Sequence, residues 1–307
     1  MNYPIIRNYF YEIISSNELI FFYNKKNLTF TGKSVGLIIK ILPFLNGEYK
    51  TEDISVETSI GLSQVEEIIQ LLINKRIVFL KHKVNNLQTI NNEQSSLFNS
   101  INNNNLTEND ALEEFSNITL KKVYVEGEST LVGKLVNAVQ EILVVTTKQD
   151  EADLIIGIDN YENKTLFSKL NDLSLSKAKP FIKAVIEEQE YNIGPIFSTK
   201  SSCYICYWNR LYSNYQNPKK DWQYYEKYNE NVKDKYYFPG LEEMFINSLK
   251  INIIKFFGSY RSQLFFNEYN YNPIKMEGNL NYILKVPGCA RCKEVNYIEE
   301  LGYEVSR

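Results

Sequence analysis

The stretch Lys121-Lys-Val-Tyr-Val-Glu-Gly-Glu-Ser-Thr-Leu-Val-Gly133 decides the fold of the larger part of this 307-residue chain. A short β-branched and aromatic run leads into a glycine turn and then into apolar residues at helical spacing. Further apolar runs at 142–146, 152–159 and 181–185 are typical of strands. Strand, glycine turn, helix and strand in this order predict a Rossmann-like α/β domain over residues 118–307.

The glycine turn departs from the nucleotide-binding fingerprint G-x-G-x-x-G. Glu126 stands where the first glycine belongs, and Glu128 follows Gly127. Backbone amides hold a phosphate only where the chain approaches it closely, and two carboxylates at this turn would repel an anion. We therefore assign no nucleotide-binding residue and no catalytic residue to the chain.

The four cysteines form two pairs, Cys203-Tyr-Ile-Cys206 and Cys289-Ala-Arg-Cys292, with 82 residues between them. Two C-x-x-C pairs supply a complete tetrahedral thiolate set for zinc, closed to water and substrate. Disulfides would need an oxidising compartment, and the N-terminus has no signal-peptide pattern. A thioredoxin-like motif would explain only one pair. The sequence thus predicts a structural zinc ion, with the only histidine, His82, at the surface.

Charge and hydropathy exclude several function classes. The net charge is −3, so no overall field favours nucleic acid as a partner. The sequence contains no apolar run long enough for a transmembrane helix, which predicts a protein without a membrane partner. Together with four cysteines expected to be reduced, this indicates a cytoplasmic location.

Residues 1–84 are predicted to form a winged helix-turn-helix. Glu66, Glu67 and the neutral Gln64 and Gln70 lie on the exposed side of its third helix, where acidic groups would repel DNA. A scaffold or dimerisation domain and a peptide-binding domain remain open at this point. The expected strands are 9–14, 19–23, 28–31 and 77–80, and the expected helices are 33–45, 51–59 with Thr51 as its cap, and one opened by a Ser63–Glu66 capping box.

The remaining segments are less regular. Asparagine runs in residues 85–117 predict a polar linker that has room for one short helix. Residues 241–257 have the composition of a long helix, and strands are expected near 263–266 and 282–285. Arg210 and Arg291, beside the cysteines, are interpreted as cations that offset the charge of a zinc tetrathiolate.

The second domain resembles the ThiF-like family, which is related to ubiquitin-activating enzymes. The matching residues are Ala152-Asp-Leu-Ile-Ile-Gly-Ile-Asp159-Asn160 and the two cysteine pairs. In active members the acid of the Asp-Asn pair helps to hold Mg-ATP and an arginine follows. Here Lys164 stands at the position of that arginine, and the glycine loop has degraded.

The whole domain order resembles the ocin-ThiF-like partner proteins of thiazole/oxazole-modified peptide biosynthesis, in microcin-type and thiopeptide pathways. The resemblance rests on a winged helix, a ThiF-like domain, Gly194-Pro195, Cys203-x-x-Cys206-x-x-x-Arg210 and Gly288-Cys-Ala-Arg-Cys292. It implies a non-catalytic subunit that binds the leader of a ribosomal precursor peptide. A separate YcaO-type cyclodehydratase would use ATP to form azolines, with an azoline dehydrogenase and a second copy of the chain as compatible partners.

Leader capture in that family adds a strand beside the third strand of the winged helix. The predicted leader-binding residues are Asn27, Leu28, Thr29 and Phe30 on that strand and Gln64, Glu67, Ile68 and Leu71 on the third helix. Core packing is the competing interpretation of Phe30 and Ile68. Two other functions stay open: an ATP-dependent adenylating enzyme of the ThiF class acting on a peptide carboxylate, and a zinc-containing DNA-binding regulator.

Overall fold

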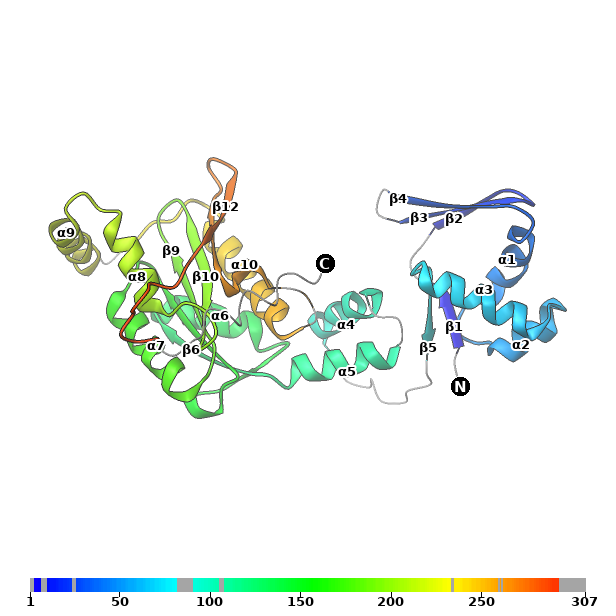
Figure 1. The fold of residues 1–307 in the computed structure, drawn as a ribbon, viewed down its shortest axis with the longest axis horizontal. Coiled ribbons are helices and arrows are strands. Elements are labelled where there is room, and N and C mark those ends of the chain that lie inside the picture. The colour runs from blue at the N-terminus through cyan, green and yellow to red at the C-terminus, as the bar shows by residue number, and fades with distance from the viewer. Residues whose placement is uncertain are drawn as a thin grey trace. The chain divides into compact units, whose positions relative to one another are not determined.

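The computed structural model describes residues 3–6, 10–23, 26–81, 91–104, 108–232, 235–258, 260 and 262–292. The chain divides into two compact units, Met1–Ser116 and Asn117–Arg307 (Figure 1). His82 and the first part of the expected linker lie outside the described residues. Among the described helices, none has the length and apolar character needed to cross a lipid bilayer.

The first unit opens with strands and continues with helices. Its three-stranded antiparallel sheet has the order β2-β3-β4, and a separate pair joins β1 to β5. The strand pair β1–β5 was not anticipated, although a strand near 77–80 was. The elements are β1 (Tyr3–Ile6), β2 (Phe10–Ser15), β3 (Glu18–Tyr23), β4 (Lys26–Thr31), α1 (Val35–Ile41), η1 (Leu42–Phe44), α2 (Thr51–Thr58), α3 (Leu62–Asn74) and β5 (Val78–Lys81).

Two predicted helix caps are wrong. α3 begins at Leu62, one residue before the expected box, and its N-cap residue Gly61 makes no side-chain cap. α2 begins at Thr51, and the N–H of Lys50 donates to the Asp53 carboxylate at 3.1 Å. Burial of its apolar stripe stabilises α3 without a side-chain cap, because its buried residues follow helical spacing. Those residues are Val65, Ile68, Ile69, Leu72 and Ile73.

The expected linker contains two helices, α4 (Asn92–Asn104) and α5 (Glu108–Thr119). Leu97, Phe98 and Ile101 are buried on α4, and the Phe98 ring meets Phe115 of α5 edge to face at 5.6 Å. The asparagine content suggested a linker because asparagine favours turns. A few apolar residues at spacings of three and four positions are enough to bury one face of each helix and override that preference.

The second unit is built on a seven-stranded mixed sheet with the order β12-β11-β10-β9-β8-β6-β7. β6 pairs parallel with β7 and β8, and β8 pairs parallel with β9. The other neighbours are antiparallel. The strands are β6 (Lys122–Gly127), β7 (Val144–Val145), β8 (Leu154–Asp159), β9 (Phe181–Ile186), β10 (Tyr191–Phe197), β11 (Asn267–Asn272) and β12 (Glu277–Tyr282).

Helices cover both faces of this sheet (Figure 1). Every residue of β8 and β9 is buried, as expected for central parallel strands. α7 and α8 pack on the face that carries Ile155 and Phe181, whereas α10 meets Tyr191 on the other face. The helices are α6 (Ser129–Val139), η2 (Gln149–Glu151), α7 (Lys164–Lys177), α8 (Tyr204–Ser213), α9 (Pro218–Asn231), α10 (Leu241–Phe257) and η3 (Gln263–Phe265). The expected strand near 263–266 is therefore wrong, because η3 lies there, between α10 and β11. The strand expected near 282–285 is also misplaced, because β12 ends at Tyr282.

Gly127 is required by the approach of β6 to β8. Its φ is +153°, and a Cβ at this position would lie 1.6 Å from the carbonyl oxygen of Ile158. We expect Gly127→Ala to lower the free energy of unfolding by roughly 2 kcal/mol or more. Gly133, inside α6, has open space around its Cα, so Gly133→Ala should raise the free energy of unfolding by about 0.5–1 kcal/mol. Denaturant unfolding of both variants tests this, and equal effects would contradict it.

Candidate functional site

β4 lies at the end of its sheet, so one of its two edges has no neighbouring strand among the described residues. Leu28 and Phe30 are half-buried and pack on the core of the first unit. The Phe30 ring meets Phe21 at 5.7 Å. Asn27 and Thr29 are exposed. Within the described residues, β4 thus presents unpaired backbone groups at one edge, while alternate side chains anchor it to the core.

The predicted helix residues divide into an exposed set and a core residue. Gln64, Glu67 and Leu71 are exposed on α3, and the Leu71 side chain has 40% of its surface accessible. Ile68 is 8% exposed and belongs to the hydrophobic cluster on which Leu28 and Phe30 also pack. α3 and the open strand β4 are therefore parts of one packed body.

The structure brings the four cysteines together. The Cys203 Sγ lies 3.7 Å from the Sγ atoms of Cys206 and Cys289, and the Cys206 Sγ lies 3.5 Å from that of Cys292. All four lie within 4.8 Å of one another. Sulfurs about 2.3 Å from a tetrahedral ion are roughly 3.8 Å apart, whereas a disulfide is about 2.05 Å long. The four thiols are free and can hold a metal ion.

The surroundings favour the thiolate form at one of the four cysteines, Cys206. The Val286 N–H donates to the Cys206 Sγ at 3.3 Å. The pKa of the Cys206 thiol is lowered to about 5, chiefly because Cys203 donates to it and also because Val286 does. Arg210 does not point at the sulfurs, since its guanidinium donates to the carbonyls of Leu284 and Lys285 at 2.9 and 3.2 Å. It ties α8 to the segment that carries the second cysteine pair.

The N-terminus of α6 is capped by the chain's own carboxylate. Glu128 accepts the N–H groups of Thr130 and Leu131 at 3.0 and 2.8 Å. In nucleotide-binding folds, such helix N-terminal amides hold a phosphate. Burial by itself favours the neutral acid, but the two amide donors outweigh it and lower the pKa of Glu128. An ionised group of the protein thus occupies this helix N-terminus.

Asp159 ends β8 and is held inside the protein. It is 5% exposed, and it accepts from the Asn160 N–H at 2.7 Å and from the Asn163 side chain at 2.9 Å. Burial raises the pKa of its carboxyl above the usual value. The Lys235 ammonium donates to the Asn160 carbonyl at 2.7 Å. Lys164 lies over the Trp208 ring, 4.7 Å from its centroid, and makes a packing contact at the start of α7.

A buried ionic cluster was missed by the sequence analysis. Lys183, in the middle of β9, is fully buried and lies 2.6 Å from Glu162 and 3.1 Å from Glu268. The Tyr207 hydroxyl lies 2.7 Å from both the Lys183 ammonium and Glu268. The lysine within the apolar run Phe181-Ile-Lys-Ala-Val185 was the available signal, because a lysine is rarely fully buried without a partner.

Comparisons with known proteins find similar solved structures but no matching sequence. No family model and no curated protein sequence matches the chain. The heterocyclase TruD superposes with a TM-score of 0.74 at 18% identity, covering 95% of this chain and 43% of TruD. A heterocyclase in complex with substrate and cofactor gives 0.71 at 16% identity, covering 95% of this chain and 39% of that one.

MccB of E. coli matches along its full length. The structure of MccB with MccA gives a TM-score of 0.62 at 12% identity, covering 95% of this chain and 100% of MccB. The structure of MccB with ATP gives 0.60 at 15% identity, with the same coverage. This chain spans less than half the length of the TruD heterocyclase and nearly all of MccB. These likenesses show that it shares their mixed α/β fold.

Proposed function

We propose that this chain is the non-catalytic, leader-binding component of an azoline-forming cyclodehydratase complex. Its first unit is a winged helix that holds the leader of a ribosomal precursor peptide as a strand added to β4, beside α3. A separate YcaO-type enzyme uses ATP to form azolines in the core peptide. Holding the leader raises the effective concentration of the core at that enzyme, so this chain needs no catalytic side chain.

The open edge of β4 carries the proposal. Its backbone donors and acceptors are available to an extended peptide, and its inward side chains share a core with α3. The fold is that of MccB, which has been solved with MccA, and of a heterocyclase solved with substrate. The part of TruD that this chain matches is 43% of its length.

The metal in this proposal is structural zinc. Four thiolates in a tetrahedron are a typical zinc donor set, and they leave no position for water or substrate. The residues that would hold it are Cys203, Cys206, Cys289 and Cys292. A metal there supplies cross-linking between α8 and the segment after β12 and takes no part in a reaction.

A ThiF-class adenylating enzyme is the second candidate. Asp159 lies at the end of β8, and the related fold of MccB has been solved with ATP. Glu128 argues against this function, because its carboxylate takes the α6 amides that a phosphate would need. ATP–pyrophosphate exchange that requires a peptide with a free carboxylate would favour the second candidate over the first.

Two leucines on α3 provide a matched test of leader binding. Leu71 and Leu62 are 40% and 41% exposed and nine positions apart, so they lie on opposite sides of the helix. We expect Leu71→Ala to weaken binding of a labelled leader peptide by roughly fivefold to tenfold, because a contact worth about 1 kcal/mol is lost. Leu62→Ala should change it less than twofold. Equal effects in fluorescence anisotropy would show that the leader does not lie along the predicted side.

A further inference from the structure

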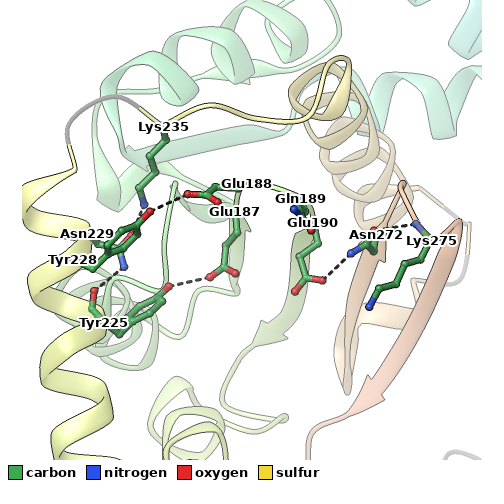
Figure 2. Close-up of a pocket in the computed structure, with 10 residues that line it drawn as sticks. All are labelled: Glu187, Glu188, Gln189, Glu190, Tyr225, Tyr228, Asn229, Lys235, Asn272 and Lys275. Carbon is green, nitrogen blue, oxygen red and sulfur yellow. Dashed lines mark hydrogen bonds between the residues drawn. The ribbon is translucent and has the colours of Figure 1, made fainter.

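A pocket of about 540 Å³ opens at the carboxyl edge of the second unit's parallel strands. Its floor is the turn from Glu187 to Glu190, which follows the end of β9. α9 forms one wall and the hairpin between β11 and β12 forms the other (Figure 2). In open α/β sheets, ligands bind at this edge of the parallel strands. The pocket lies at this edge of the sheet beside the end of β9, next to but not at the crossover between β6 and β8.

Three carboxylates in the pocket are held by neutral donors. The Tyr225 hydroxyl donates to Glu187 and the Tyr228 hydroxyl donates to Glu188, both at 2.9 Å. The Asn272 amide lies 3.5 Å from Glu190 (Figure 2). Within the described part of the chain, none of the three glutamates forms a salt bridge. Hydrogen bonds therefore fix the three carboxylates in position, and the Lys235 ammonium interacts electrostatically with Glu187 and Glu188.

The position of Tyr225 is itself fixed from the core. Its oxygen accepts the N–H of Glu162 at 2.9 Å, and the Glu162 side chain binds the buried Lys183. Burial, and after it the Glu187 charge, raise the pKa of Tyr225, so it stays a protonated donor. The arrangement of Tyr225 and Glu187 is thus set before any ligand arrives, which lowers the entropic cost of binding.

Two lysines also line the pocket, and they differ in their hydrogen bonds to the described residues. The Lys235 ammonium donates to the Asn160 carbonyl and to the Asn229 side chain. Lys275 is exposed on the hairpin between β11 and β12. Three glutamates and two lysines leave the pocket with a net negative charge. Such a pocket repels carboxylates and phosphates.

We propose that this pocket binds the cationic side chain of a peptide, an arginine guanidinium or a lysine ammonium, between Glu187 and Glu190 and against the rings of Tyr225 and Tyr228. Carboxylates supply charge-assisted hydrogen bonds, and tyrosine faces attract cations. This inference adds a second binding site to the proposed function. It depends on that function for one assumption, that the ligand is a peptide. The second unit then binds a part of the precursor peptide other than the leader.

The test uses the full chain and a fluorescein-labelled peptide Gly-Arg-Gly-Arg-Gly, with citrulline in place of arginine as the neutral control. We expect the citrulline peptide and the variant Glu187→Gln/Glu190→Gln each to weaken binding at least tenfold. Lys275→Gln should tighten it severalfold, because it removes a repelling charge. Glu57→Gln/Glu113→Gln changes the net charge equally at exposed positions outside the pocket and should stay within twofold.

Three results would overturn the proposal. These are equal weakening by the charge-matched control, weaker binding by Lys275→Gln, or displacement of the peptide by spermidine at a lower concentration than by unlabelled peptide. Leader binding is measured on the same variants. Lost binding of the short peptide with intact leader binding supports the pocket, whereas absent leader binding in every variant counts against the proposed function alone.

Discussion

Replacing Cys206 or Cys289 by alanine is expected to remove the bound zinc and to lower the free energy of unfolding of the second unit by at least about 3 kcal/mol. The two cysteine pairs are 82 residues apart, so the metal joins the start of α8 to the segment after β12. Three remaining thiolates cannot complete the tetrahedron, and they lose the cation that they share.

Elemental analysis of the purified variants measures the loss of zinc, and thermal unfolding measures the loss of stability. Arg291→Ala is the matched control, because Arg291 lies inside the same motif and its exposed guanidinium pairs with the Asp172 carboxylate at 3.6 Å. An exposed ion pair contributes little, so this variant should keep both the zinc and the melting temperature. Leader binding should survive in the cysteine variants, since it belongs to the first unit. A Cys206→Ala chain with full zinc and unchanged melting would refute the structural role.

Lys183→Met is expected to destabilise the second unit by roughly 3–5 kcal/mol, because it leaves two buried carboxylates without their cation. Lys183 is fully buried, and Glu162 and Glu268 lie 2.6 and 3.1 Å from its ammonium. Burial raises the pKa of Glu162 in the folded protein, and loss of the ammonium raises it further. The folded variant then binds protons that the unfolded chain releases.

The deficit should therefore grow as the pH rises from about 5 to about 8, because stability falls wherever the folded state binds more protons than the unfolded state. Denaturant unfolding at both pH values measures it. The triple variant Lys183→Met/Glu162→Gln/Glu268→Gln removes all three charges and should recover much of the loss. A deficit independent of pH that the triple variant does not reduce would mean that packing, and not charge, explains the effect.

Features with a strong local signature were predicted from the sequence. The parallel strands β8 and β9 were visible as apolar runs because both their faces are buried. α3 was visible from its apolar stripe. The four cysteines were expected to meet because their spacing has few other uses, and their sulfurs do meet.

Features that depend on distant partners were not predicted. β1 is stabilised by pairing with β5, more than 70 residues later, and nothing local marks it. Glu128 was interpreted only as a group that repels an anion, whereas its carboxylate also fills the α6 N-terminus. The Lys183 cluster combines β9, the loop after β8, α8 and β11. The pocket beside it likewise needs four separate segments to exist.

The most direct test of the central claim is a fluorescence-anisotropy titration of a labelled leader peptide with the purified, zinc-loaded chain in the absence of ATP. The account predicts submicromolar binding without nucleotide, together with no peptide-dependent ATP–pyrophosphate exchange by the same preparation. No leader binding by the folded chain at any accessible concentration, with exchange that depends on a peptide carboxylate, would contradict it and identify the chain as an adenylating enzyme.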